Sequence, residues 1–320
     1  MKHAEPLILI RSDTYADEDM RRAIREIAPG ARVATDEDVD NAPGLFERVE
    51  VCLGRLPGED LPKANALRWM HTTNAGSDWA TRPEWRAHPV TITNSRIHAA
   101  PICEQLFGML FALTRALDFS LRKQQERRWD RPPHDRLLCM FGKTLCVLGL
   151  GNIGRHCAKV GHAFGMRVVG VRRTPKETPF VEEVHPPERI REAVAGADVV
   201  MAILPGVEDT RGIINAGVFA AMKPGAHFLN AGRGATVVTD ALVEALREGR
   251  LAGAGLDVTD PEPLPPDHPL WGLPNVIITP HDSGTFVGYN AEVRKQFLAN
   301  LRRWVNGEPL ELVVDKEAGY

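Results

Sequence analysis

Short apolar runs alternate with segments of helical spacing along the second half of the chain. The six runs lie at residues 145–148, 167–171, 199–204, 226–230, 253–258 and 276–279. Near-continuous apolar strands separated by helices, such as residues 240–247, are typical of a parallel sheet that is covered on both faces. The pattern therefore predicts a doubly wound α/β domain in this half of the chain.

The first part of the chain shows a shorter version of the same alternation. Apolar runs predict strands at residues 7–10, 49–53 and 67–70, and helical spacing predicts a helix over residues 17–27, which is followed by Pro29 and Gly30. A last long helix is predicted over residues 285–305, before Asn306-Gly307. We expect a smaller α/β domain here, to which a strand-like tail at residues 310–314 returns.

The two predicted parts are joined by an apolar helix pattern at residues 101–117 and a charge-rich stretch at residues 118–136. A charge run of this kind is usually a solvated face or an oligomer arm. A length of 320 residues also suits two domains, because single hydrophobic cores stop growing beyond about 250–300 residues.

Charge and cysteine content exclude several classes of function. The net charge of −3 gives no electrostatic reason to expect nucleic acid as a partner. The five cysteines are scattered without metal-ligand or redox spacing, so we expect buried, reduced thiols and no metal. No apolar run is long enough for a signal peptide or a bilayer span, which leads us to expect a cytoplasmic protein with no membrane partner.

A glycine-rich turn follows the strand at residues 145–148. In Gly149-x-Gly151-x-x-Gly154, the first glycine allows a tight turn, the second lets a ligand approach the backbone, and the third lets the next helix pack against the strand. The start of that helix offers N–H groups to phosphates. The motif alone is weak, but its position between a strand and a helix predicts a dinucleotide site.

Polar side chains follow three of the later strands. Arg233 comes after residues 226–230, Glu262 after 253–258, and His281 after 276–279. Ligands of open α/β sheets bind at the carboxyl ends of the strands, so we expect the three side chains on one rim. An arginine can clamp a carboxylate, a histidine can transfer a proton to a C2 oxygen, and a neighbouring carboxylate favours the imidazolium. Taken alone, each residue is also explained as an ordinary loop residue. Their joint occurrence predicts a site that acts on a 2-oxo or 2-hydroxy acid.

The same region resembles the D-isomer-specific 2-hydroxyacid dehydrogenase family. The matching segments include Asn-Ala-Gly-Arg-Gly-Ala from residue 230, the stretch from Ala241 to Asp257-Val, and Pro-Asn-Val-Ile-Ile-Thr-Pro-His from residue 274. The resemblance extends over essentially the whole chain, including Ala75-Gly76-x-Asp78.

The resemblance implies a Rossmann dinucleotide-binding domain at residues 99–284 and a flavodoxin-like substrate domain at residues 1–98 and 285–320, with a catalytic cleft that closes between them. In that arrangement Arg233 binds the substrate carboxylate, His281 is the acid/base and Glu262 is its partner. The backbone of Asn74, Ala75 and Gly76 also receives the substrate. A homodimer forms through the dinucleotide domain, with residues 101–140 as helix and arm.

The expected cofactor contacts come from the glycine turn, the ends of later strands and the loops after them. Asp257 is expected to bind the edge of the nicotinamide. The full set is Gly149, Gly151, Asn152, Ile153, Gly154, Arg172, Arg173, Thr174, Leu204, Pro205, Thr210, Ala231, Gly232, Asp257, Ser283 and Gly284.

The residues that follow the second strand of this domain indicate which cofactor is preferred. NAD-binding proteins carry an acidic residue about 20 positions beyond the glycine turn, which binds the ribose 2′-hydroxyl. Arg172 stands there instead, followed by Arg173 and Thr174. Two guanidinium groups and a hydroxyl suit a 2′-phosphate, so we expect NADP to be preferred, with NAD possible.

The predicted function is NAD(P)H-dependent reduction of a small 2-oxo acid to the D-2-hydroxy acid, with glyoxylate and hydroxypyruvate as the first substrates to test. The segment from Asn94 to His98 lacks the glycine that relatives often carry, which leaves the identity of the substrate open. Two alternatives remain. One is oxidation of formate or phosphite on the same scaffold, against which the presence of Glu262 argues. The other is a non-enzymatic, cofactor-sensing protein similar to related corepressors.

Overall fold

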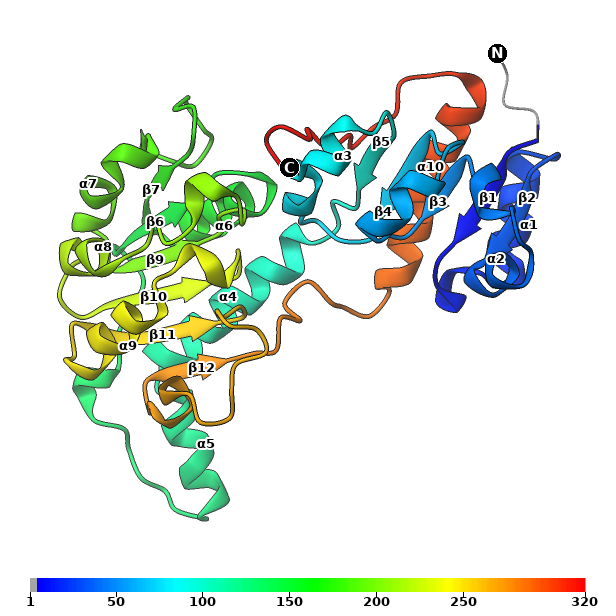
Figure 1. Ribbon diagram of the computed structural model, residues 1–320. Coiled ribbons are helices and arrows are strands. Elements are labelled where there is room, and N and C mark those ends of the chain that lie inside the picture. The colour runs from blue at the N-terminus through cyan, green and yellow to red at the C-terminus, as the bar shows by residue number, and fades with distance from the viewer. Residues whose placement is uncertain (1–4, 320) are drawn as a thin grey trace. The chain divides into compact units, whose positions relative to one another are not determined.

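The computed structural model describes residues 5–319, and residues 1–4 and 320 of the predicted substrate domain lie outside the described part. The chain divides into two compact units, residues 1–97 with 286–320 and residues 98–285. These boundaries differ by one residue at each junction from those expected from the sequence. Each unit is an α/β structure around one parallel sheet (Figure 1).

The second unit contains a seven-stranded parallel sheet in the order β12-β11-β10-β9-β6-β7-β8. This is the strand order of a doubly wound dinucleotide-binding fold. Its strands are β6 (Thr144–Leu148), β7 (Arg167–Val171), β8 (Glu183–His185), β9 (Val199–Ala202), β10 (Ala226–Asn230), β11 (Leu251–Leu256) and β12 (Val276–Ile278). The six predicted strands are all present. The seventh, β8, was missed because it is short and polar at its start.

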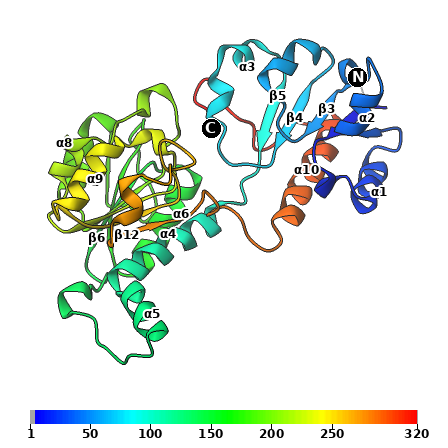
Figure 2. The same cartoon turned by 60° about the horizontal axis from the view of Figure 1, so that its bottom comes forward.

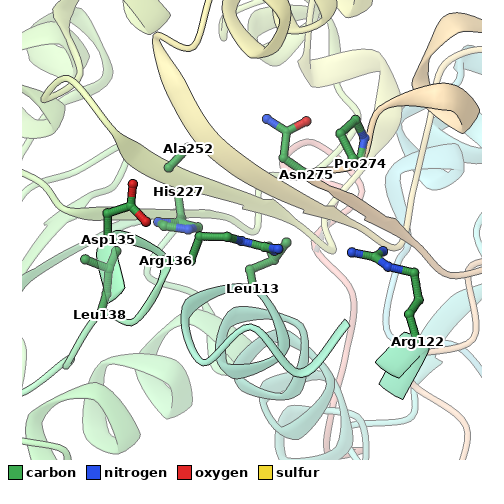
Figure 3. Close-up of a pocket in the computed structure, with 9 residues that line it drawn as sticks. All are labelled: Leu113, Arg122, Asp135, Arg136, Leu138, His227, Ala252, Pro274 and Asn275. Carbon is green, nitrogen blue, oxygen red and sulfur yellow. The ribbon is translucent and has the colours of Figure 1, made fainter. Parts of the chain in front are cut away.

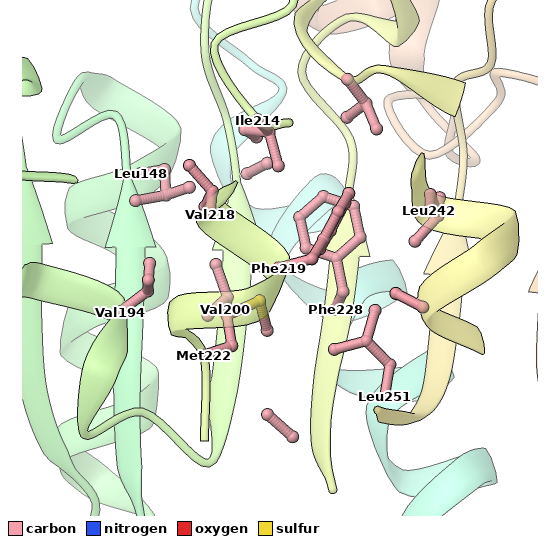
Figure 4. Close-up of a cluster of buried hydrophobic side chains, with 14 of the residues drawn as sticks. Leu148, Val194, Val200, Ile214, Val218, Phe219, Met222, Phe228, Leu242 and Leu251 are labelled. Carbon is pink, nitrogen blue, oxygen red and sulfur yellow. The ribbon is translucent and has the colours of Figure 1, made fainter. Parts of the chain in front are cut away.

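Helices cover both faces of this sheet. The helices of the second unit are α4 (Ala99–Thr114), α5 (Leu117–Gln125), α6 (Asn152–Ala163), α7 (Ile190–Ala195), α8 (Ala216–Ala221) and α9 (Thr239–Arg247). On one face, α4 and α6 bury a cluster that includes Leu106, Leu145 and Cys157. On the other face, α7, α8 and α9 cover a cluster centred on Phe219 and Phe228 (Figure 4). Burial on both faces explains why the strands are apolar at nearly every position.

The helix predicted over residues 101–117 is α4, which ends at Thr114, and a second helix, α5, begins at Leu117. Ala116 adopts a left-handed conformation, with φ of 50°, and separates α4 from α5. Helix α5 and the loop that follows it extend away from the sheet, as Figures 1 and 2 both show. The side chains of α5 include no buried residue, which fits both interpretations of its charge run, a solvated face and an oligomer arm.

The first unit contains a five-stranded parallel sheet in the order β2-β1-β3-β4-β5, as in flavodoxin-like folds. Its strands are β1 (Leu7–Ile10), β2 (Arg32–Thr35), β3 (Val51–Leu53), β4 (Trp69–Thr72) and β5 (Thr91–Asn94), and its helices are α1 (Glu18–Ile27), α2 (Asp36–Asn41), α3 (Pro83–Ala87) and α10 (Tyr289–Asn306). Helices α1 and α10 pack on one face. The strands β2 and β5 were not anticipated from the sequence.

The C-terminal tail returns to the first unit as expected, but the strand predicted at residues 310–314 is wrong. The tail makes one isolated antiparallel bridge, between Thr93 and Val313. Leu312 has a φ of 61°, which is incompatible with a continuous strand. The expectation of buried thiols also needs one correction, because Cys139 is exposed while the other four cysteines are buried.

Candidate functional site

The glycine turn after β6 has the geometry that its three glycines predict. A side chain at Gly149, where φ is +104°, would collide with the carbonyl oxygen of Ile203, and one at Gly154 would collide with that of Gly149. By contrast, no atom lies within 4 Å of the position that a Cβ atom would take at Gly151, so there is open space beside this residue. Gly151 is the N-cap of α6, so the unpaired N–H groups of the first helical turn, which begins with Asn152 and Ile153, lie next to this open space.

The end of β7 supplies a second feature that fits a dinucleotide. The Nη1 atom of Arg172 is buried and has no hydrogen-bond partner within residues 5–319. The next two residues, Arg173 and Thr174, are exposed. Because a guanidinium binds phosphate oxygens well, an unpartnered nitrogen at this position fits a ribose 2′-phosphate better than a ribose hydroxyl. The residues present therefore fit NADP.

The turn after β10 fixes the backbone on both sides of Arg233. The side chain of Asn230 accepts a hydrogen bond from the Gly232 N–H at 3.0 Å and donates one to the carbonyl oxygen of Arg233 at 3.2 Å. A side chain at Gly234 would collide with the backbone of Thr259. The guanidinium of half-buried Arg233 donates to the carbonyl oxygen of Gly232 at 2.9 Å.

The structure brings His281 and Glu262 into direct contact. The Nδ1 atom of His281 lies 2.5 Å from Oε1 of Glu262, and the two side chains are 47% and 42% exposed. The loops that carry Arg233, Glu262 and His281 follow β10, β11 and β12, which are adjacent in the sheet. All three residues therefore stand at the carboxyl ends of neighbouring parallel strands, the edge where open α/β sheets bind ligands.

Asp257, expected to face the nicotinamide, is buried and hydrogen-bonded within the protein. Its carboxylate accepts hydrogen bonds from the side chain of Thr279 and from the backbone of Asp282 and Ser283. Thr279 was not predicted from the sequence. Its position two residues before the candidate catalytic His281 could have indicated a role, because its hydroxyl can form a hydrogen bond near the site.

The remaining predicted cofactor residues lie at the same edge of the second unit. Leu204 and Pro205 follow β9, and the hydroxyl of Thr210 closes their loop by donating to the carbonyl oxygen of Pro205 at 2.5 Å. Ala231 is buried after β10. A side chain at Gly284 would meet the ring of His98 at 2.9 Å, so this glycine permits close packing at the start of α4.

The turn at residues 74–76, which belongs to the first unit, is held by side chains that the sequence did not reveal. Asn94 donates to the carbonyl oxygen of Ala75 at 2.8 Å, and Tyr289 donates to that of Thr73 at 2.7 Å. These contacts join positions 19 and 216 residues apart. No local pattern could have identified them.

Strand β4, which precedes this turn, carries a buried histidine, His71, whose environment differs from that of His281. The ring of His71 is bonded to the hydroxyls of Thr93 at 2.8 Å and Ser95 at 3.2 Å. Burial lowers the pKa of His71 to about 4. The side chain is therefore a neutral part of the core of the first unit at pH 7.

A separate cavity of about 330 Å³ opens at the amino ends of β10, β11 and β12. Its lining includes Arg122, Arg136 and His227, and none of the predicted site residues (Figure 3). Within residues 5–319 no group of three or more His, Cys, Asp or Glu side chains is arranged to hold a metal ion. No helix of this described part has the length and apolar character needed to cross a membrane.

Comparison with known proteins agrees with this geometry. Residues 107–283 match the family described as "D-isomer specific 2-hydroxyacid dehydrogenase, NAD binding domain". A glyoxylate/hydroxypyruvate reductase A from Serratia proteamaculans is 31% identical over 95% of this chain and 96% of its own length.

Two solved structures share the fold over nearly the whole chain. A D-isomer specific 2-hydroxyacid dehydrogenase family protein from Aeromonas salmonicida is 34% identical, with a TM-score of 0.83 over 97% of this chain and 99% of its own. An NADPH-dependent glyoxylate/hydroxypyruvate reductase from Sinorhizobium meliloti, solved with NADP and sulfate, is 25% identical, with a TM-score of 0.82 over 98% of this chain and 100% of its own. With its strand order, its glycine turn and these matches, the chain belongs to the D-isomer specific 2-hydroxyacid dehydrogenase family.

Proposed function

We propose that the protein reduces a small 2-oxo acid to the D-2-hydroxy acid with NADPH, and that glyoxylate and hydroxypyruvate are its first candidate substrates. The observation that carries this proposal is the 2.5 Å contact between His281 and Glu262 at the carboxyl edge of the sheet. The named activity of the Serratia and Sinorhizobium relatives supports it.

Each of the three edge residues has a distinct role in this reaction. The guanidinium of Arg233 binds the substrate carboxylate and polarises the C2 carbonyl. Protonated His281 donates its Nε2 proton to the C2 oxygen, while Glu262 accepts the Nδ1–H and holds the ring in one orientation. The bound cofactor supplies the hydride that the C2 carbon requires. The backbone of residues 74–76 is proposed to bind the substrate carboxylate as well.

NADP is proposed as the preferred cofactor because of the end of β7. The buried, unpartnered Nη1 of Arg172 and the exposed Arg173 offer positive charge where NAD-specific proteins carry a carboxylate. In the Arg172→Ala/Arg173→Ala double variant, we expect kcat/KM with NADPH to fall by about 10- to 100-fold, since charge-assisted hydrogen bonds are lost. The value with NADH should change little. Preference of the wild type for NADH would contradict the proposal.

We also propose that the protein forms a homodimer through its second unit, with α4, α5 and the loop after α5 at the interface. Trp129, on that loop, is 98% exposed, and Leu121 on α5 is 60% exposed. A partner that covered this part of the second unit would remove these apolar side chains from water. Sedimentation of the wild type and of a Leu121→Asp/Trp129→Asp variant tests this: the wild type should be dimeric and the variant monomeric.

One experiment distinguishes the proposed reaction from its competitors. Purified protein is assayed with a panel of 2-oxo acids and both reduced cofactors, and in the other direction with formate and phosphite. Turnover of glyoxylate or hydroxypyruvate supports the proposal. Tight cofactor binding without any turnover would instead favour a cofactor-sensing protein, and oxidation of formate or phosphite alone would favour the other chemistry.

A further inference from the structure

The turn at residues 74–76 is anchored by two side chains from other elements of the first unit. The hydroxyl of Tyr289, the first residue of α10, donates to the carbonyl oxygen of Thr73 at 2.7 Å. The amide of Asn94, the last residue of β5, donates to the carbonyl oxygen of Ala75 at 2.8 Å. Burial raises the pKa of Tyr289, so its hydroxyl keeps its proton at neutral pH and remains a donor. Both anchors therefore act on the backbone of the turn itself.

An anchored carbonyl group also fixes the direction of an N–H group. In a trans peptide, the carbonyl group of one residue and the N–H of the next lie in one plane and point in opposite directions. The carbonyl group of Thr73 shares its peptide with the N–H of Asn74, and that of Ala75 shares its peptide with the N–H of Gly76. The first and last of the three peptide groups that present these N–H groups are therefore fixed, and the middle one is held from both sides.

The helix that supplies the Tyr289 hydroxyl is packed firmly on the sheet of the first unit. Val293, Phe297 and Leu301 of α10 are buried against this sheet (Figure 1). The ring of Phe297 stacks on that of Trp69 in β4, with the two centroids 5.0 Å apart. Because β4 leads into the turn, the donor and its acceptor belong to two elements that pack on each other. A support of this kind holds a binding group in one geometry.

We propose that Tyr289 is a positioning residue, whose hydroxyl holds the backbone of residues 74–76 so that its N–H groups face the substrate carboxylate. This inference rests on the proposed function, which assigns carboxylate binding to that backbone. Asn94 has the same task at the other end of the turn. The carboxylate is common to glyoxylate and hydroxypyruvate, so Tyr289 affects the binding of both to the same extent.

Tyr289→Phe tests the proposal because it removes the hydroxyl and keeps the ring. We expect KM to rise about three- to tenfold for glyoxylate and for hydroxypyruvate alike, the usual effect of losing one hydrogen bond between neutral groups. The value of kcat should stay within about twofold of wild type, since the proposed proton donor is untouched. The Kd for NADPH, measured by fluorescence titration, should also stay within about twofold. An unchanged KM for both substrates would overturn the proposal.

Tyr15→Phe is the matched control. The hydroxyl of Tyr15 donates to Oδ1 of Asn290 at 2.8 Å, and Asn290 is the neighbour of Tyr289 in α10. This variant therefore loses a tyrosine hydrogen bond at the same end of the helix but no contact with the turn, and its KM should equal that of wild type. An equal rise of KM in both variants would also overturn the proposal, because the effect would then come from a displaced α10.

Crystal structures of the wild type and of Tyr289→Phe give a readout that does not depend on the reaction. We expect the peptide group between Thr73 and Asn74 to rotate in the variant, so that the N–H of Asn74 points in a new direction. A turn identical to that of the wild type would overturn the inference, even if the protein reduces glyoxylate. If the protein reduces no 2-oxo acid, the proposed function fails, and the two structures still decide whether Tyr289 holds the turn.

Discussion

The carboxyl and amino ends of the seven-stranded sheet both carry histidine and arginine side chains, but these lie in different environments. At the carboxyl end, His281 is half-exposed and its ring contacts the carboxylate of Glu262. At the amino end, His227 is 4% exposed, and burial lowers its pKa to about 4. We propose the first histidine as a proton donor to the substrate, whereas the second is neutral at pH 7.

The arginines of the two ends have different partners. At the amino end, Arg122 and Arg136 both bind the carboxylate of Asp118, at 3.0 and 2.9 Å. The single carboxylate therefore offsets part of the positive charge of the two guanidinium groups. At the carboxyl end, the guanidinium of Arg233 donates to the backbone carbonyl oxygen of Gly232. The two ends therefore differ in the groups that these arginines contact.

The largest effect that would distinguish the two ends is expected from the histidines. His281→Gln removes the proton donor and should lower kcat for glyoxylate reduction by about 10²- to 10⁴-fold, the usual contribution of a general acid. His227→Gln at the amino end should leave kcat within about threefold of wild type in protein whose circular dichroism is native. Equal losses in both variants would remove the distinction between the two ends.

A smaller effect is expected from the arginines. Arg233→Ala should raise KM for glyoxylate and also lower kcat, with a combined loss in kcat/KM of about 10- to 100-fold, because a charge-assisted contact to the substrate is lost. Arg122→Ala, which removes an arginine already paired with Asp118, is the control and should leave both parameters near wild type. Normal kinetics in Arg233→Ala would contradict its role as a carboxylate clamp.

The buried His227 predicts how the free energy of unfolding depends on pH. The pKa of His227 in the folded protein is about 4, below the ordinary value of 6.5, so the unfolded chain binds more protons between these two values. Its contribution to stability is complete above pH 6.5 and is lost as the pH falls toward 4, by up to about 3 kcal/mol. In His227→Gln, unfolding by urea should depend less on pH over this window. An unchanged dependence would show that His227 is not a source of the acid sensitivity.

The smallest effect is expected from the partner of His281. Glu262→Gln replaces the carboxylate that contacts Nδ1 of His281 by a weaker, uncharged acceptor, so the ring should be held less firmly and kcat for glyoxylate reduction should fall. The loss should be roughly tenfold or less, because the pair is close to half-exposed and screened by water. Glu192→Gln, which removes a carboxylate paired with Arg189, should leave kcat unchanged.

The sequence by itself determined the α/β class, the six apolar strands of the second unit and the glycine turn. These features are local, since a buried parallel strand shows as an apolar run and the turn requires glycine at fixed positions. The sequence also shows that Arg233, Glu262 and His281 each follow a predicted strand. Because ligands bind at the carboxyl ends of parallel strands, this order was enough to predict that the three residues lie at one edge of the sheet.

Only the tertiary structure decided how these residues are held. The donors to the Asp257 carboxylate include the hydroxyl of Thr279 and the N–H of Ser283, which lie 22 and 26 residues away from it, and His281, with a φ of 56°, lies between these two donors in the chain. Likewise, the polar β8 forms because β7 offers it an edge, and the tail at residues 310–314 stops at a single bridge because Leu312 leaves the extended conformation. Such contacts join distant positions, and no local periodicity records them.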